Sequence, residues 1–172
     1  SPHGPDMTER MIVTTGPVPL EALADGEGPP VVLLASLGRG AEDFDDLAPR
    51  IASAGFRAIR PQPRGIGASG AAEEGVSLNT LSDDVAAIID AVGGRAILIG
   101  HAFGNRLARN TARRHADKVW ALVLLACGGQ APIAPDAMAD LVAVFDTSLP
   151  AEAHLGHVRR AFFAPGNDAA VW

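Results

Sequence analysis

The chain has 172 residues, of which 48% are hydrophobic and 20% are charged. That apolar content predicts one domain with a sizeable core and argues against disorder over most of the length. The formal net charge of −6 argues against a nucleic-acid or anionic-membrane partner, because both need a basic surface.

The cysteine content and the apolar runs bear on the compartment. Cys127 is the only cysteine, so the chain cannot form an internal disulfide. The longest apolar run covers residues 119–127 and is far too short to cross a bilayer. Residues 1–10 are polar and lack the apolar stretch of a signal peptide. We therefore expect a cytoplasmic protein, with residues 1–10 forming a flexible N-terminus or a remnant of an expression vector.

Hydrophobic periodicity predicts strands that alternate with helices along most of the chain. Such alternation favours parallel strands joined by right-handed crossovers. We expect strands at 11–14, 18–24, 31–35, 56–60, 96–99 and 119–126. We expect helices at 41–54, ended by Gly55, then at 78–92, after Gly100 through about residue 115 and, less regularly, at 136–147 and 151–163.

The segment Gly100-His101-Ala102-Phe103-Gly104 stands between an apolar strand and a helix. A turn this tight requires glycine near its central residue. It holds that residue exposed at the C-terminal edge of the sheet, with the positive end of the helix behind it. The pattern resembles the G-x-S-x-G nucleophile elbow of the α/β-hydrolase-fold superfamily.

The resemblance to that superfamily extends over roughly residues 18–130. Residues 28–34 resemble its third strand, residues 64–69 the loop after its fourth strand, and residues 119–126 its sixth strand. It implies an α/β fold with a mostly parallel sheet, helices on both faces and the start of a helical cap. By this resemblance, residues 11–132 form the N-terminal part of the core and residues 133–172 begin the cap.

Alanine stands where the superfamily places its nucleophile, and Ala102 has neither a lone pair nor a proton to lose. An engineered Ser→Ala change in a hydrolase explains only this position. The chain also has Ala35-Ser36 where the superfamily often has His-Gly, and Gln62-Pro63 where it often has an aspartate. Together these departures favour a natural branch with altered chemistry over an engineered inactive mutant.

An oxyanion hole does not depend on the lost side chain, because backbone N–H groups form it. By resemblance, Leu37 and Phe103 supply these groups. Ser36, His101 and Cys127 are further candidates to line the pocket. Ser36 is a substitute nucleophile without a nearby base in sequence, or a turn serine bonded to its own backbone. Cys127 is a buried structural thiol or a nucleophile.

We expect no metal site and no cofactor. His154 and His157 are one helical turn apart but have no third ligand placed beside them in sequence. Residues 65–70 match G-x-G-x-x-G, yet no helix opens within that segment, as dinucleotide binding requires.

In the superfamily, the catalytic acid and histidine follow strands that come after the sixth one. Nothing beyond residue 130 resembles a strongly apolar buried strand, so strand 119–126 is expected to be an apolar edge. We expect the C-terminal remainder of the fold to be a missing segment or a second chain.

Two hypotheses on function follow. The first is a superfamily enzyme that acts on a small, mostly apolar, carbonyl-containing substrate through an oxyanion hole without a nucleophile. The second is a pseudoenzyme that binds a ligand in the same pocket and performs no reaction.

Overall fold

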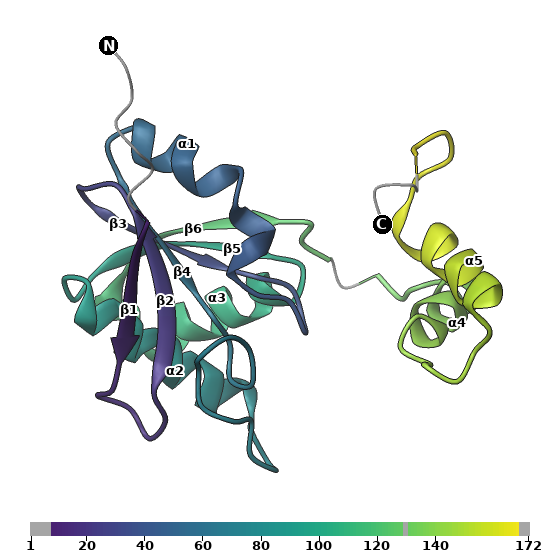
Figure 1. Ribbon diagram of the computed structural model, residues 1–172, viewed down its shortest axis with the longest axis horizontal. Helices are drawn as coiled ribbons and strands as arrows, with labels where there is room; N and C mark the ends of the chain where they lie inside the picture. The colour runs from purple at the N-terminus through teal and green to yellow at the C-terminus, as the bar shows by residue number, and fades with distance from the viewer. Residues whose placement is uncertain (1–7, 129–130, 169–172) are drawn as a thin grey trace. The chain divides into compact units, whose positions relative to one another are not determined.

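The structure, a computed structural model, describes residues 8–128 and 131–168, which belong to two units, residues 1–128 and 129–172. The first unit is a sheet with helices on both faces (Figure 1). The described part of the second unit contains two helices. The strands are β1 (Glu9–Val13), β2 (Leu20–Asp25), β3 (Pro30–Leu34), β4 (Arg57–Pro61), β5 (Ala96–His101) and β6 (Val119–Leu125). The helices are α1 (Leu47–Ser53), α2 (Leu78–Ala91), α3 (Phe103–Arg114), α4 (Pro135–Ala143) and α5 (Ala151–Phe162), with short 3-10 helices η1 (Ala41–Phe44) and η2 (Ala116–Lys118).

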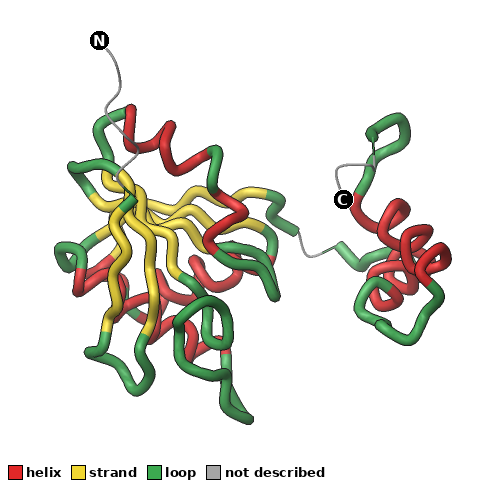
Figure 2. Tube along the Cα trace, in the orientation of Figure 1, coloured by secondary structure: helices red, strands yellow, loops and turns green. Residues whose placement is uncertain are grey.

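The six strands form one sheet in the order β1-β2-β4-β3-β5-β6. The four strands from β4 to β6 are parallel, and β1 and β2 add an antiparallel pair at one edge. The predicted mostly parallel α/β architecture is therefore confirmed, and its layers are visible in Figure 2.

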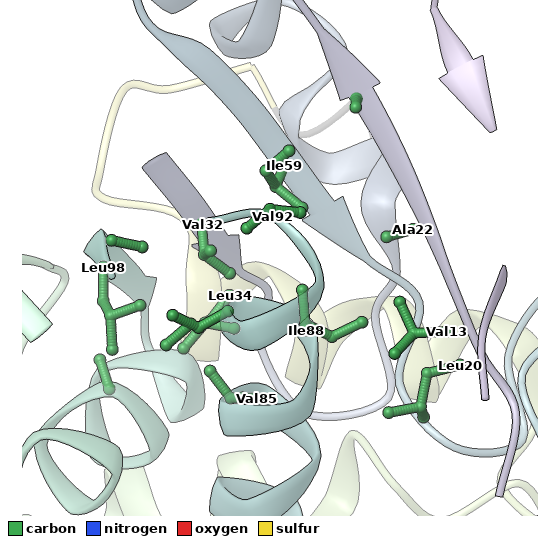
Figure 3. Close-up of a cluster of buried hydrophobic side chains, with 14 residues drawn as sticks. Val13, Leu20, Ala22, Val32, Leu34, Ile59, Val85, Ile88, Val92 and Leu98 are labelled. Atoms are coloured by element: carbon green, nitrogen blue, oxygen red, sulfur yellow. The ribbon is translucent and has the colours of Figure 1, made fainter. Parts of the chain in front are cut away.

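The core is built on the two faces of β3, whose five residues are all buried. Val32 and Leu34 face the side covered by α2 and α3, where they meet Val85 and Ile88 (Figure 3). Leu33 faces the side covered by α1. A continuous apolar run is the mark of a strand with helices on both faces, as expected for residues 31–35.

The helix expected at 41–54 is interrupted, because only η1 and then α1 form within it. Pro49 explains the break. Proline lacks an N–H and fits a helix only in its first turn, so a helix that contains Pro49 begins near residue 47. The predicted end is confirmed: Gly55, directly after the C-cap of α1, has a φ of +87°.

Of the segment 1–10 that was expected to be flexible, residues 1–7 lie outside the described residues, and the end of the segment belongs to a strand. Glu9 and Arg10 belong to β1 and pair with β2. Their side chains form ion pairs with Arg57 and Glu21. These cross-strand charges hold residues whose polarity had suggested an unstructured tail.

Strand β6 is the last strand of the sheet and exposes apolar side chains on both faces. Trp120, at 49% exposure, and Val123, at 41%, lie on opposite faces of the strand, because side chains alternate along it. Among the described residues, no helix is long and apolar enough to cross a membrane.

Candidate functional site

The elbow has the geometry that its sequence predicts. β5 ends at His101 and α3 begins at Phe103, so Ala102 alone makes the turn. Its φ of 51° and ψ of −112° lie outside the regions that alanine normally adopts. Such strain persists only where the surrounding structure imposes it, and it is commonly found at functional sites. The prediction of a sharp strand-to-helix turn at residue 102 is confirmed.

Two glycines allow the strand and the helix to approach closely. A Cβ atom on Gly100 would overlap the backbone of Gly104 and Asn105. A Cβ atom on Gly104 would overlap the carbonyl oxygen of Leu34, at the end of β3. The glycines flanking the elbow are therefore required by backbone contacts, as the sequence indicated.

The two amides expected to form an oxyanion hole have no acceptor in the part of the chain that the structure describes. Phe103 is the first residue of α3, where a helix leaves its N–H groups without intrahelical partners. Leu37 lies in the loop after β3, and its N–H donates to none of the described residues. Both amides are thus available to an external oxygen.

Leu37 and Phe103 line the same cavity, which has a volume of about 470 Å³. It lies on the α2 and α3 side, beneath the loop that joins β4 to α2. Its floor is apolar, formed by core residues such as Leu34, Val85 and Ile88, which lie side by side in Figure 3. The volume falls within the range of roughly 300–1,000 Å³ that is typical of small-molecule sites.

The charged groups on the cavity wall neutralise each other. Arg64 donates two hydrogen bonds to Asp84, at 2.7 and 2.8 Å, and the two side chains are only 5% and 10% exposed. The hydrogen bond with Asp84 raises the pKa of Arg64 above its ordinary value. This ion pair fastens the loop after β4 to α2 and leaves the wall without net charge.

The side-chain amide of Gln62, in the same wall, is also hydrogen-bonded within the protein, through both its oxygen and its nitrogen. Its Oε1 accepts from the backbone N–H of Ala41 at 2.9 Å, and its Nε2 donates to Glu42 at 2.8 Å. The glutamine that departs from the superfamily pattern therefore has a structural position between β4 and η1.

Of the three further pocket candidates, Ser36 alone lines this cavity. Its side-chain hydroxyl has no hydrogen-bond partner within the described residues, although its backbone carbonyl accepts from the N–H of Arg39. His101 is half-buried and lies outside the cavity lining. Cys127 is exposed and lies outside it as well. The alternative of a buried thiol was wrong for Cys127, because no strand covers the far side of β6 in the described residues.

The described residues contain no group of three or more His, Cys, Asp or Glu side chains that could hold a metal. His154 and His157 have partners that the sequence did not indicate. His157 Nδ1 lies 2.7 Å from Asp140 Oδ1, and Arg160 donates to the same carboxylate. His154 Nε2 lies 2.7 Å from the carbonyl oxygen of Val144. These contacts join α4 to α5.

The sequence reasoning missed the pairing of Arg64 with Asp84. The two residues are twenty positions apart, and no local pattern links them. The available signal is the position of Asp84 on the apolar side of the helix, three residues after Leu81 and four before Ile88.

The comparisons agree with the elbow and the sheet. The model of the alpha/beta hydrolase fold family matches residues 29–154. The chain is 36% identical over 129 residues to epoxide hydrolase A of Mycobacterium tuberculosis, covering 69% of this chain and 38% of that protein. It is 33% identical over 107 residues to a putative non-heme haloperoxidase of mycobacteriophage D29, covering 61% of this chain and 38% of that protein.

Solved structures are similar in the same region. The crystal structure of an epoxide hydrolase from Vigna radiata has a TM-score of 0.67 and 27% identity, with 78% of this chain and 46% of that chain covered. Epoxide hydrolase A of Mycobacterium thermoresistibile has a TM-score of 0.67 and 26% identity, with 80% and 45% covered. The chain thus spans less than half the length of these relatives. With its family match, its strand order and its elbow, the chain belongs to the α/β-hydrolase fold family.

Proposed function

We propose that the protein binds a small, mostly apolar, carbonyl-containing substrate at the elbow and polarises its carbonyl group without forming a covalent intermediate at residue 102. The backbone N–H groups of Leu37 and Phe103 act as the oxyanion hole. They stabilise the negative charge that develops on the substrate oxygen, for example in an enolate.

The observation that carries this proposal is the conformation of the elbow around Ala102. The turn retains the strained backbone that normally presents a nucleophile, with a φ of 51°, although alanine supplies no nucleophile. The feature that this turn still offers is the free N–H of Phe103 at the positive end of α3. A retained elbow with free amides supports a reaction that needs only charge stabilisation.

The cavity supports a non-hydrolytic reaction over attack by a substitute serine. Ser36 lines the cavity, but among the described residues the carboxylate that lines it is Asp84 alone, which is bound by Arg64. A serine without a general base is a weak nucleophile at neutral pH. The proton-transferring group of the reaction therefore belongs to a part of the protein outside this cavity.

The relatives support an enzymatic role and do not fix its chemistry. Their names include three epoxide hydrolases, a haloperoxidase and 2-(acetamidomethylene)succinate hydrolase, so the fold supports several reactions. The alternative is a pseudoenzyme that binds the same kind of ligand and leaves it unchanged. An inactive Ser→Ala mutant of a hydrolase is the third possibility.

The test uses acetophenone as an uncharged aromatic ketone and the full-length protein in deuterated water. Stabilisation of the enolate oxygen accelerates the exchange of the methyl protons of the ketone for deuterium, which NMR measures directly. Leu37→Pro removes one donor N–H, whereas Leu37→Ala keeps the N–H and shortens only an exposed side chain.

We expect catalysed exchange in the wild type and in Leu37→Ala. We expect a loss of about 10²–10³-fold in Leu37→Pro, the usual effect of deleting one oxyanion donor. Binding without any exchange supports the pseudoenzyme instead. Equal exchange rates in the two Leu37 variants contradict the oxyanion role of its amide.

A further inference from the structure

The cavity beneath the loop after β4 is lined by one side-chain hydroxyl that has no hydrogen-bond partner among the described residues. This hydroxyl indicates the kind of ligand that the cavity takes. Five polar side chains line the cavity: Ser36, Gln62, Arg64, Ser77 and Asp84. Four of them are satisfied by protein partners, as described above for Gln62 and for the ion pair. Ser77 accepts from the N–H of Thr80 as the N-cap of α2.

Ser36 is the exception among the lining residues that the structure describes. Its hydroxyl neither donates to nor accepts from any described group, although the side chain is half-buried. A hydroxyl carries one donor and two acceptor sites. The oxygen keeps access to water in the cavity, because it is not among the buried side-chain atoms that lack a partner. A ligand oxygen at this position takes the place of that water as the partner of the hydroxyl.

The remaining lining defines the rest of the ligand. Leu81, Val85, Ile88 and Leu107 present apolar side chains from α2 and α3, and Leu20 and Leu34 present apolar side chains from the sheet. The charges of Arg64 and Asp84 are compensated within the wall. A charged ligand therefore loses its hydration there and gains no opposite charge, whereas an apolar group gains by burial.

We propose that Ser36 is a specificity-determining residue, which donates a hydrogen bond to the oxygen of an uncharged ligand whose apolar group fills this cavity. The inference rests on the proposed function for the identity of that oxygen as a carbonyl. A carbonyl oxygen has two lone pairs, so it accepts from Ser36 together with a backbone N–H. The ligand class is thus a neutral ketone or ester with one apolar branch of moderate size.

Three small probes separate the contributions. Acetophenone carries a carbonyl oxygen on an apolar ring, ethylbenzene has nearly the same shape without oxygen, and benzoate carries a negative charge. Binding to the full-length protein is measured by equilibrium titration with NMR of the ligand. We expect acetophenone to bind more tightly than ethylbenzene and benzoate to bind most weakly.

The variants assign this preference to the residue. Ser36→Ala is expected to weaken acetophenone binding by about 2–10-fold, as the loss of one neutral hydrogen bond does, and to leave ethylbenzene binding unchanged. Ser36→Thr retains the hydroxyl and is expected to keep most of the preference. An equal change for both probes in Ser36→Ala contradicts the proposed hydrogen bond.

A second variant tests the cavity itself. Leu81→Trp places a large aromatic ring in the cavity and is expected to weaken the binding of both uncharged probes. Ile12→Trp makes a comparable change on β1, away from the lining, and serves as the control. A thermal melt confirms that each variant is folded, and Ser36→Ala gives an independent answer if Leu81→Trp is unstable.

The binding assay and the exchange assay fail independently. If acetophenone binds in the Ser36-dependent manner but its protons do not exchange, the ligand site stands and the catalytic proposal is wrong. If exchange depends on the Leu37 amide but Leu81→Trp and Ser36→Ala bind acetophenone as the wild type does, the inference about the cavity is wrong and the catalytic proposal stands.

Discussion

The backbone N–H of Ala102 donates a hydrogen bond to the carbonyl oxygen of Leu125 at 3.0 Å. This bond extends the β5–β6 ladder by one residue beyond the pair His101 and Leu125. The elbow residue is therefore held by the last residue of the edge strand. Asn105 adds a second link, since its Nδ2 donates to the carbonyl oxygen of Ala126 at 3.4 Å. The position of the site depends on β6.

The first prediction concerns the close approach of α3 to β3. Gly104→Ala places a methyl group against the carbonyl oxygen of Leu34, a backbone atom that cannot rotate away. We expect a loss of about 1–3 kcal/mol or more in the free energy of unfolding, measured by chemical denaturation. Gly16→Ala meets only ordinary contacts and is expected to change stability by less than about 0.5 kcal/mol. Equal effects of the two substitutions contradict the proposed packing.

The second prediction compares two neighbouring aspartates. Asp84→Asn leaves the buried guanidinium of Arg64 without its counter-charge, and we expect a loss of about 3–5 kcal/mol in the free energy of unfolding. Asp83→Asn makes the same change at a side chain that is 50% exposed and paired with Arg114. There we expect at most about 1 kcal/mol.

The same pair bears on ligand choice. With Asp84 neutral, the guanidinium of Arg64 is free to attract an anion, so benzoate is expected to bind Asp84→Asn more tightly than the wild type. Unchanged benzoate affinity in a folded Asp84→Asn variant contradicts the claim that this ion pair neutralises the cavity wall.

The third prediction concerns pH and the contact between α4 and α5. Hydrogen bonds from Arg160, the larger contribution, and from His157 lower the pKa of Asp140 from 3.8 to about 2. A lowered folded-state pKa means that the ionised form stabilises the fold. This contribution is present above pH 3.8 and is lost as the pH falls toward 2. Hydrogen exchange of α4 amides between these pH values measures it.

Asp140→Asn provides the control for this titration. The variant is expected to show the weaker α4 protection already near neutral pH and to lose the pH-dependent step that is assigned to Asp140. A step of the same size in the variant assigns the titration to another group.

The fourth prediction concerns the exposed strand β6. Burial of apolar surface contributes about 25 cal/mol per Å², and an unpaired apolar edge promotes association. We expect strands from the C-terminal remainder of the fold, on the same or a second chain, to cover β6, and the 172-residue chain alone to associate. Gel filtration measures this, and Val123→Lys is expected to reduce it. A monodisperse monomer with a cooperative melt contradicts the expectation.

Much of the fold follows from local sequence patterns. The apolar run at β3 and the glycines around Ala102 predict their structures because each reflects a contact that its own segment requires. Pro49 carried enough information to divide the helix at 41–54, but its effect depends on where the helix begins. Apolar spacing at helical period does not by itself fix the residue at which a helix begins.

The cavity was less predictable, because it depends on contacts between distant segments. The position of Ser36 after a strand makes it a candidate to line the cavity. That its hydroxyl has no partner among the described residues depends on Gln62, Arg64 and Asp84, whose polar atoms bond to other groups. The exposure of Cys127 likewise depends on which strand lies beside β6, and no local pattern encodes that neighbour.

The central claim is that Ala102 belongs to a site whose chemistry does not use a nucleophile at this position. Ala102→Ser in the full-length protein tests it most directly, with p-nitrophenyl ester hydrolysis as the readout. We expect little turnover above that of the wild type, because Ala35, Ser36 and Gln62 remain as they are and the elbow serine lacks the surroundings of a hydrolase. Strong ester turnover by Ala102→Ser would show instead that the rest of a hydrolytic site is intact, and would contradict the proposed non-hydrolytic function.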